Sequence, residues 1–382
     1  IEAGNIYGFN KKRDKWKYWY SQAADHGDVS AYSWKAQFYL EEGFPFHSRK
    51  LEQMKDFLKG FDLTYDSQIQ YSVFLKTASG KLAGCGSRHE NILKCIAINP
   101  DFQGEGCLQI IITQLIKNAF EQGISHLFLF TKPMYKQMFS DMGFYSITET
   151  PDMLLMENRK DGIRQYLKEE TKNIPDCTDC SIGSIVMNAN PFTNGHKYLV
   201  ETAAKSCDYL HVFVLSTDSS EFPSDIRLEL VKQGCAHLSN VSVHGSSDYL
   251  ISHATFPDYF LKDKATATEK AAVLDLQIFG SYFKEAFHIT HRFVGEEPFS
   301  LITRTYNEQM KKILPSFDII VTEIPRCKKN NTVISATFVR QKFLEGDFLL
   351  LKDFVPKTTY DFLISPKGSE LRNQLLTTGA SL

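Results

Sequence analysis

One stretch constrains the fold more than any other: an apolar run at 182–187, a turn-rich segment at 188–195 and a helical pattern at 197–205. The apolar run predicts a short buried strand, and the Asn, Pro and Gly residues after it predict a tight turn. Apolar residues then recur at helical spacing from Leu199 to Ala204. A strand, a tight turn and a helix aim free backbone N–H groups at an anion. We therefore expect a phosphate in this turn, facing His196 in the first turn of the helix.

The chain after residue 181 alternates between strand-like and helix-like patterns. The candidate strands are 182–187, 209–215, 241–243, 291–294 and 319–321, and the candidate helices between them include 225–234, 266–279 and 303–312. This alternation predicts an α/β domain with a doubly wound, Rossmann-like parallel sheet. Ligands of such sheets bind beyond the carboxyl ends of the strands, where 188–196 lies.

The chain of 382 residues is long enough for two domains. Its first half reads as a mixture of strands and helices, with expected strands at 71–77, 82–87, 91–98 and 126–130 and expected helices at 50–60, 110–119 and 138–144. Prolines and a loss of periodicity mark 151–180. We expect domains at 1–150 and 181–382 with a linker helix and loop between them. The first 45 residues remain unassigned, since their aromatic and basic residues suit either packing or single-stranded nucleic acid.

Composition narrows the class of protein. A net charge of -2 gives no electrostatic case for nucleic acid or an anionic membrane, and no apolar run approaches the roughly 20 residues that span a bilayer. The beginning of the sequence lacks a signal-peptide pattern.

Eight scattered cysteines indicate reduced thiols and a cytoplasmic protein, and the Cys177–Cys180 CxxC pair reads as a linker feature. We expect no metal site of the protein's own; His288 and His291 lack further ligands.

The segment 99–108, between a predicted strand and a predicted helix, carries Gln103, Gly104 and Gly106. It resembles the pyrophosphate loop of GNAT-type acyl-CoA N-acetyltransferases, and Met142–Phe144 resembles that family's Gly-Phe ending. The resemblance implies an α+β domain whose three loop residues hold the diphosphate of coenzyme A or a pantetheine arm. Leu108 departs from the family's small residue, so the fold without acetyl transfer is the alternative.

Two short motifs in the second half resemble the nucleotidyltransferase superfamily. Thr193-Asn-Gly-His196 resembles its HxGH signature, and Ile334-Ser-Ala-Thr-Phe-Val-Arg340 resembles its ISxTxxR signature. The resemblance implies that His196 stabilises charge on the α-phosphate of ATP and that Thr193 hydrogen-bonds a phosphate oxygen. It also implies that Arg340 supports the departing pyrophosphate. Gly195 leaves room for the nucleotide, and Ser335 is expected to cap a helix whose first turn includes Thr337.

Four longer stretches resemble the [citrate (pro-3S)-lyase] ligases: 188–193, 221–231, 295–307 and 323–326. An acetyltransferase-like domain ahead of a nucleotidyltransferase-like domain is that family's arrangement. The resemblance implies that acetate attacks ATP to give acetyl-AMP and pyrophosphate. The acetyl group then passes to the phosphoribosyl-dephospho-CoA thiol of the citrate lyase acyl carrier subunit. Mg²⁺ would neutralise the phosphates, and no tightly bound cofactor is implied.

The remaining candidates for ATP binding each have a plain structural alternative. They are Asn188, Asn190, Pro191, Phe192, Arg227, Gly295 and Glu296. Turn geometry accounts equally for the two asparagines, core packing for Phe192, an ion pair on the helix surface for Arg227, and a solvated loop for Glu296. The polar segment 328–331 suits either a loop or an attraction for an acidic carrier protein.

Two other activities stay open on the sequence alone: an adenylyltransferase of the pantetheine-phosphate type, and a coenzyme A-dependent N-acetyltransferase. No residue clearly activates the acceptor thiol; His89 and His126 are candidates, with a structural role as the alternative. The oligomeric state and the residues that hold acetate are not specified.

Overall fold

The computed structural model describes residues 38–44, 46–172, 174, 179–216, 220–245, 248–250, 264–298, 300–329 and 332–378. The aromatic and basic residues before residue 38, Cys177 and part of the 328–331 segment lie outside this set. The described residues form two compact units, which divide along the chain between Gly162 and Ile163; only 264–267 are counted with the first unit from beyond that point. Each unit is described by itself.

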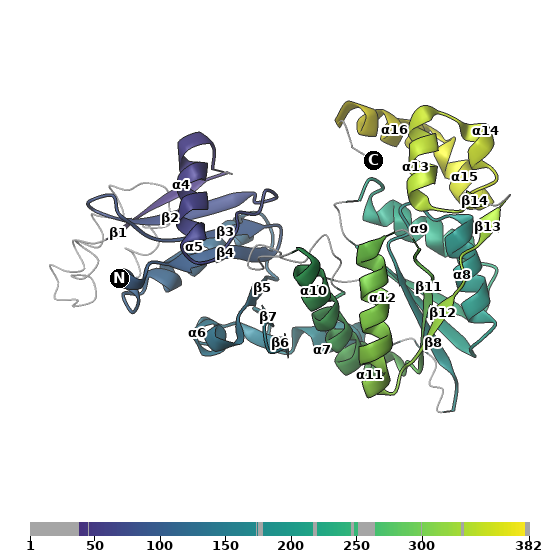
Figure 1. Cartoon of the computed structure of the whole chain (residues 1–382), viewed down its shortest axis with the longest axis horizontal. Helices are drawn as coiled ribbons and strands as arrows, with labels where there is room; N and C mark the ends of the chain where they lie inside the picture. The colour runs from purple at the N-terminus through teal and green to yellow at the C-terminus, as the bar shows by residue number, and fades with distance from the viewer. Residues whose placement is uncertain are drawn as a thin grey trace. The chain divides into compact units, whose positions relative to one another are not determined.

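The first unit contains a seven-stranded sheet with the order β1-β2-β3-β4-β5-β7-β6 (Figure 1). Its strands are β1 (Phe38–Gly43), β2 (Tyr71–Thr77), β3 (Leu82–His89), β4 (Ile92–Ile98), β5 (Phe128–Thr131), β6 (Tyr145–Glu149) and β7 (Leu154–Glu157). All neighbours are antiparallel except β4 and β5, which pair in parallel. The helices are α4 (Ser48–Lys59), α5 (Cys107–Glu121) and α6 (Lys136–Ser140). This is the α+β fold that the GNAT resemblance implies.

Two cores hold this sheet. On one face α5 packs through Ile111 and Leu115, and on the other α4 packs through Met54 and Leu58. The close approach of α5 depends on Gly86 of β3, since a Cβ there would lie 2.4 Å from Ile111. Burial on both faces explains why β2 and β4 read as mostly apolar runs.

Strand β7 differs from the expected division of the chain. It pairs with β5 and β6, so the first sheet continues beyond residue 150, and the segment expected to be a linker supplies one of its strands. In the sequence Pro151 indicated the end of the domain, whereas in the structure it only follows the end of β6. Helix α7 (Gly162–Glu170) then buries Ile163 and Leu167 in the second unit.

The second unit is built on a parallel sheet with the order β10-β9-β8-β11-β12. The strands are β8 (Ile182–Met187), β9 (Tyr209–Val214), β10 (Val241–Gly245), β11 (His291–Gly295) and β12 (Ile320–Ile324). In chain order this is 3-2-1-4-5, so the predicted doubly wound sheet is confirmed. The order reverses between β8 and β11, and crevices at such reversals bind ligands.

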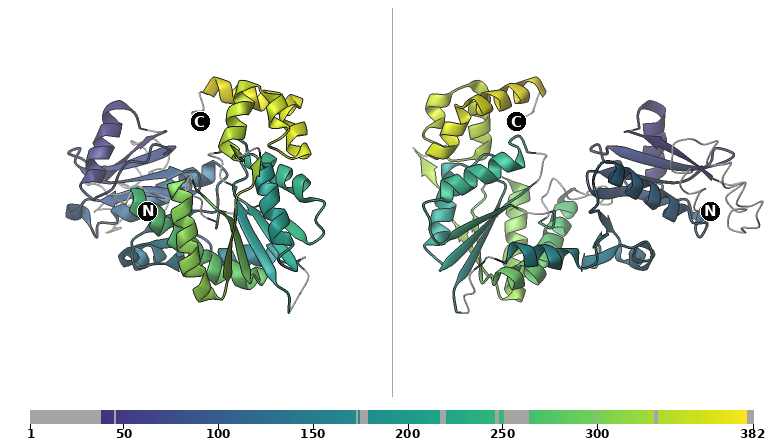
Figure 2. Two further views of the ribbon diagram at one scale, coloured as in Figure 1. Left: turned by 45° about the vertical axis from the view of Figure 1, so that its right-hand side comes forward. Right: turned by 180° about the vertical axis from the view of Figure 1, so that it is seen from behind.

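Helices cover both faces of this sheet (Figures 1 and 2). One face carries α8 (Asn194–Ala204) and α9 (Ser224–Cys235). The other carries α10 (Lys264–Ile278), a π-helical turn (Phe279–Phe283), α11 (Lys284–Phe287) and α12 (Leu301–Ile313). A further cluster with its own core contains α13 (Ala336–Glu345), α14 (Phe348–Leu351), α15 (Lys357–Leu363) and α16 (Pro366–Thr378).

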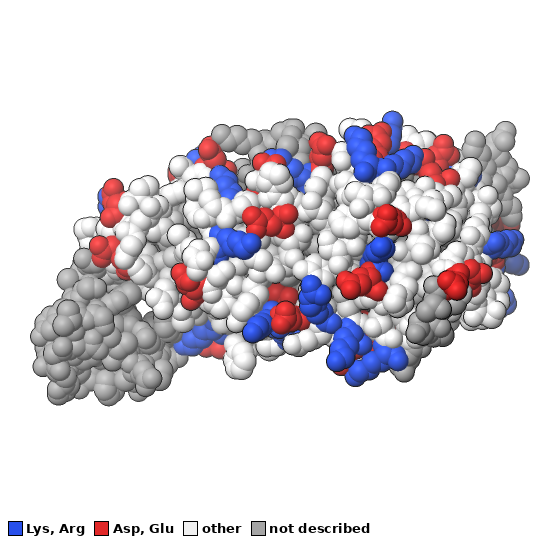
Figure 3. Space-filling view, turned by 90° about the horizontal axis from the view of Figure 1, so that it is seen from below, with Lys and Arg blue, Asp and Glu red and all other residues white. Residues whose placement is uncertain are grey.

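Charge and cysteine chemistry largely follow expectation. Basic and acidic side chains are interspersed on the face in Figure 3, as a net charge of -2 suggests. Among the described residues, no helix is both long and apolar enough to cross a membrane.

Six described cysteines are free, but Cys180 is disulfide-bonded, so the expectation of reduced thiols is wrong for that residue.

Candidate nucleotide site

The turn after β8 is clamped by a fully buried arginine. Arg227 of α9 is 0% exposed, and its guanidinium donates to the backbone oxygens of Asn188 at 2.8 Å, Leu215 at 2.6 Å and Phe222 at 2.9 Å. Its burial contradicts a place on the helix surface, and its predicted phosphate contact stays a prediction. These bonds hold three loops together at the carboxyl end of the sheet.

The next residues of the turn alternate between polar contacts and core packing. Asn190 is buried and its side-chain oxygen accepts from Phe222 N–H at 3.0 Å. Phe192 is 0% exposed, and a Cβ on Gly234 of α9 would lie 2.4 Å from its ring. Its ring stacks under the imidazole of His196, with 5.9 Å between centroids. Core packing thus accounts for Phe192, which supports His196 and is not exposed to a nucleotide.

A capping box fixes His196 at the start of α8. Thr193 is the N-cap; its hydroxyl accepts from the His196 N–H at 3.4 Å, and the His196 Nδ1 accepts from the Thr193 N–H at 3.1 Å. Histidine here takes the part that Glu or Gln usually plays. Because Nδ1 is an acceptor, the proton of the neutral ring is on Nε2. Burial, together with the nearby Arg326 cation, lowers the pKa of His196 to about 4. At neutral pH the ring is an uncharged donor.

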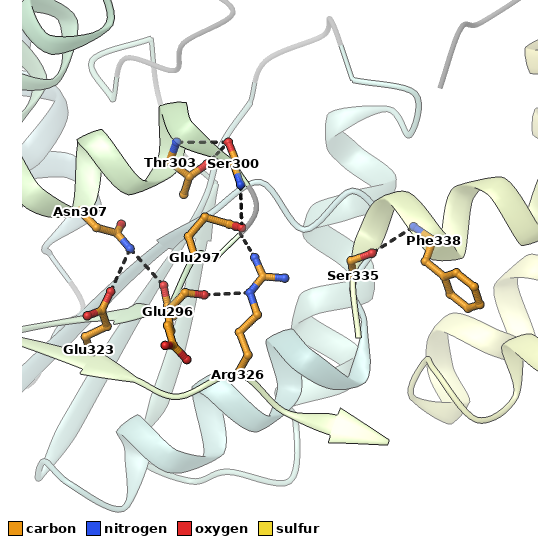
Figure 4. Close-up of polar contacts among 10 residues, drawn as sticks. Glu296, Glu297, Ser300, Thr303, Asn307, Glu323, Arg326, Ser335 and Phe338 are labelled. Atoms are coloured by element: carbon orange, nitrogen blue, oxygen red, sulfur yellow. Dashed lines mark hydrogen bonds and ion pairs between the residues drawn. The ribbon is translucent and has the colours of Figure 1, made fainter. Parts of the chain in front are cut away.

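Gly195 brings the two predicted motifs together. A Cβ on this residue would lie 3.3 Å from the Ile334 backbone oxygen, a contact tighter than most side chains tolerate. The start of α8 therefore packs directly on the segment that leads into α13. Ser335 is the N-cap of α13, and its hydroxyl accepts from the Phe338 N–H at 3.2 Å (Figure 4). The predicted cap is confirmed, and the first turns of two helices are neighbours.

Arg340 links α13 to the turn. Its Nη1 donates to the Asn190 backbone oxygen at 2.7 Å, and its Nη2 reaches the Thr337 hydroxyl at 3.4 Å. Its Nε lies 3.1 Å from a carboxylate oxygen of Glu221, and the side chain is 16% exposed. Asn190 also donates to Glu221. Glu221 begins the 221–231 stretch that resembles the ligase family, but the sequence did not predict it as a site residue.

A second missed residue, Arg326, lies just after β12. Figure 4 shows its guanidinium reaching the Glu296 backbone oxygen, at 2.8 Å, and the Glu297 carboxylate. Glu297 also accepts from the Ser300 N–H, which precedes α12. The Glu296 side chain carries no bond in this group, so its predicted ligand contact stays a prediction. Arg326 ends the 323–326 stretch that resembles the ligase family. Its distance from His196 in the sequence gave no reason to expect that the two lie close together.

Strand β11 ends at Gly295 beside this group. The Asn307 side chain donates to the Gly295 backbone oxygen at 3.1 Å, and the Glu296 N–H donates to the Ile324 oxygen at 2.9 Å. The structure thus brings most predicted positions to one edge of the sheet. Those positions are Asn188, Asn190, Pro191, Thr193, Gly195, His196, Gly295, Glu296, Ser335, Thr337 and Arg340.

The first unit contains a separate cavity of about 520 Å³ between the ends of β4 and β5. Gln103, Gly104 and Gly106 line it, as the predicted loop requires, and Leu108 lines it as well. Both glycines have positive φ, 85° and 72°, and Gly106 directly precedes α5. Among the described residues of either unit, no group of three His, Cys, Asp or Glu side chains is placed to hold a metal ion.

Comparison with known proteins assigns the chain. Residues 182–363 match the model of the citrate lyase ligase C-terminal domain. The [citrate [pro-3S]-lyase] ligase of Haemophilus influenzae is 40% identical over 321 residues, which cover 82% of this chain and 95% of the relative. The chain belongs to the [citrate [pro-3S]-lyase] ligase family. The Escherichia coli ligase of the same name is 39% identical over 322 residues, covering 83% of this chain and 91% of that protein. The predicted family and enzyme class, a ligase, are confirmed.

One of the open alternatives has a local match. A phosphopantetheine adenylyltransferase of Haemophilus influenzae is 43% identical over 63 residues, which cover 16% of this ligase-family chain and 40% of that protein. Such a match reflects a shared segment of sequence, whereas the ligases match along most of the chain. The adenylyltransferase alternative is therefore not favoured.

Proposed function

We propose that this ligase activates citrate lyase by acetylating the prosthetic-group thiol of its acyl carrier subunit, with acetate and ATP as substrates. An acetate oxygen attacks the α-phosphorus of ATP, and the bond from that phosphorus to the β-bridging oxygen breaks. This step gives acetyl-AMP and pyrophosphate. The thiolate then attacks the acetyl carbonyl carbon, and AMP leaves with the oxygen that joined it to the acetyl group.

The observation that carries the proposal is the contact between the starts of α8 and α13. Gly195 lies against the Ile334 oxygen, and Arg340 reaches back to the Asn190 oxygen at 2.7 Å. Two helix starts, an imidazole donor and a guanidinium then surround one place at a strand-order reversal. That combination suits a triphosphate and a developing negative charge on its α-phosphate.

Within this site the Nε2–H of His196 donates a hydrogen bond to an α-phosphate oxygen. Because burial lowers the pKa of the His196 imidazolium to about 4, the ring is neutral at pH 7 and keeps its Nε2 proton during the step. Acetate is already an anion, so adenylation requires alignment and charge neutralisation more than a general base. Arg340 turns from Glu221 toward the departing pyrophosphate. Mg²⁺ would be carried by the triphosphate oxygens and would neutralise their charge.

The cavity of the first unit suits the carrier's pantetheine arm. Its walls are mainly apolar, which fits a flexible chain of methylene and amide groups, and the backbone around Gly104 and Gly106 offers N–H groups to a phosphate. Leu108 narrows the cavity next to that loop. This assignment concerns binding of the arm, and acetyl transfer from coenzyme A is not required.

The test compares His196→Ala with His237→Ala, a change at an exposed histidine of the same unit that pairs with Glu201. Acetate-dependent pyrophosphate release should fall at least about a hundredfold in His196→Ala, as expected for loss of one charge-stabilising donor, and should be unchanged in His237→Ala. Near-normal release from His196→Ala would refute the assigned role. Mass spectrometry should find an acetyl group on the carrier; a retained adenylyl group would favour an adenylyltransferase instead.

A further inference from the structure

The guanidinium of Arg340 is held loosely by its neighbours. Its Nε lies 3.1 Å from a carboxylate oxygen of Glu221, but this nitrogen has no hydrogen-bond partner among the described residues. Its Nη1 donates to the Asn190 backbone oxygen at 2.7 Å, and its Nη2 is 3.4 Å from the Thr337 hydroxyl. Arginine and a carboxylate often form two parallel hydrogen bonds. The Arg340–Glu221 pair is an ion pair without that geometry.

Arg227, which contacts the same turn, shows how a firmly attached guanidinium is held in this unit. It is fully buried and donates to three backbone oxygens and to the Asn188 side chain. The Arg340 side chain is 16% exposed, and its Nε lacks an acceptor in the described chain. Arg340 therefore has less to give up than Arg227 when a phosphate oxygen offers itself as an acceptor.

Glu221, in contrast, is held in place. Its other carboxylate oxygen accepts from the Asn190 side chain, and the side-chain oxygen of Asn190 accepts from the Phe222 N–H at 3.0 Å. Asn190 and Phe222 are both buried. In the part of the chain that the structure describes, Arg340 is the only Lys or Arg that pairs with Glu221. A fixed negative charge thus lies beside the cation that we expect to hold the pyrophosphate of ATP.

A polyphosphate and the Glu221 carboxylate then have to share one guanidinium. A phosphate oxygen that binds Arg340 displaces the ion pair, and Glu221 keeps its charge without that cation. Loss of a partly exposed ion pair corresponds to about a fivefold change in affinity. The carboxylate should therefore weaken the binding of β- and γ-phosphates, which Arg340 contacts, and should leave the binding of an α-phosphate alone unchanged.

We propose that Glu221 competes with pyrophosphate for Arg340 and so promotes the release of that product. The ligand class is a diphosphate, either free or as the β,γ end of a nucleoside triphosphate. This inference rests on the proposed function for its premise that Arg340 supports the departing pyrophosphate. Glu221 is a positioning residue that acts through Arg340, and no bond forms or breaks at its carboxylate. Re-formation of the ion pair favours the departure of pyrophosphate.

Calorimetric titration of the full chain with pyrophosphate in the presence of Mg²⁺, at constant ionic strength, tests this competition. Glu221→Gln should lower the Kd for pyrophosphate at least about fivefold and the Kd for ATP by a similar factor, while the Kd for AMP stays within about twofold. Glu229→Gln removes the same charge at an exposed position of α9 and should change none of the three values. Equal or weaker binding of pyrophosphate by folded Glu221→Gln would overturn the proposal.

A second background tests whether the effect passes through Arg340. Pyrophosphate should bind more weakly to Arg340→Gln, and adding Glu221→Gln to that variant should no longer tighten its binding. Tightening of the same size in that background would show direct repulsion by Glu221 and would contradict the competition. Because damage to the fold weakens binding, a gain in affinity separates this role from a merely structural one.

The same titrations separate this inference from the proposed function. If the wild type binds neither pyrophosphate nor ATP, both fail. If the wild type binds both and releases pyrophosphate with acetate, but Glu221→Gln binds pyrophosphate no more tightly, only the competition fails.

Glu221→Asp guards against misfolding of Glu221→Gln, which circular dichroism would report. It keeps the charge but withdraws the carboxylate from Arg340, so it should tighten the binding of pyrophosphate by a smaller factor. Wild-type affinity for pyrophosphate in Glu221→Asp would contradict the proposal even if Glu221→Gln does not fold.

Discussion

At the scale of single residues, His196 is held by contacts that a neutral ring satisfies. Its Nδ1 accepts from the Thr193 N–H, and protonation of Nδ1 would set two donors against each other. The fall of its pKa to about 4, caused by burial and by Arg326, has the same consequence. The capping interaction and the electrostatics therefore favour one protonation state, in which only Nε2 donates.

The histidine pair of β9 and β10 predicts a pH-dependent stability. His211 Nδ1 and His244 Nε2 are 3.0 Å apart, and burial lowers their pKa values to about 3 and about 4. An unfolded histidine titrates near 6.5, so between about pH 6.5 and 4 the unfolded chain binds more protons. The free energy of unfolding should therefore fall as the pH drops through that window.

Urea unfolding at pH 7 and pH 5 measures this effect. The double variant His211→Gln, His244→Gln should lose roughly 4 kcal/mol of the pH dependence relative to the wild type. His237→Gln, at an exposed position, is the matched control. An unchanged pH dependence in the double variant would show that the pair does not carry the effect.

The sequence predicted only some of the residues that the structure brings to the site. Thr193, His196 and Ser335 could be anticipated because short motifs fix their place on a helix start. The buried position of Arg227 could not, since nothing in its local sequence distinguishes a fully buried arginine from one at the surface. Arg326 lies 130 positions after His196 in the chain, and only the sheet brings it close enough to affect the imidazole.

At the scale of elements, the start of α13 combines a structural cap with a place in the site. Replacing Ser335 by Ala removes the bond to the Phe338 N–H and should lower the free energy of unfolding by about 1 kcal/mol. Because that helix start faces α8, the same change should also raise the KM for ATP several-fold, by disturbing the first-turn N–H groups.

Asp347→Ala provides the control at a comparable cap. Asp347 caps α14 through the Leu350 N–H at 3.3 Å. The Asp347→Ala variant should show a similar loss in its free energy of unfolding, measured by urea denaturation, with no change in the KM for ATP. If both variants alter ATP use equally, general loss of stability rather than position would be the cause.

Element prediction succeeded where patterns were local. Strands β2 and β8 were predicted with the bounds observed, because each is a short apolar run ended by turn residues. Strand β7 was missed although Leu154 to Met156 are apolar, since the prolines and charges around it suggested a linker. It pairs with β5, whose residues lie between 23 and 29 positions earlier in the chain, and no local pattern encodes that pairing.

At the scale of the whole molecule, the two units are proposed to serve two half-reactions. Gln103→Trp places a large side chain at the exposed rim of the cavity in the first unit. The KM for the carrier in thioester formation should rise at least about tenfold, equivalent to ~1.4 kcal/mol. Pyrophosphate release from ATP and acetate should be unaffected. Phe120→Trp, at an exposed position of α5, is the control.

That prediction has a clear contrary outcome. If Gln103→Trp acetylates the carrier with wild-type KM, the cavity does not receive the arm. A fall in pyrophosphate release without carrier would instead connect the first unit to adenylation and contradict the division of labour.

The most direct measurement follows oxygen from acetate. With acetate labelled by ¹⁸O in both carboxylate positions, AMP formed during acetylation of the carrier should gain one ¹⁸O, and pyrophosphate should gain none. The rate of labelled AMP formation should fall at least about a hundredfold in His196→Ala. Unlabelled AMP, or ¹⁸O in pyrophosphate, would show that acetate does not attack the α-phosphate and would contradict the account.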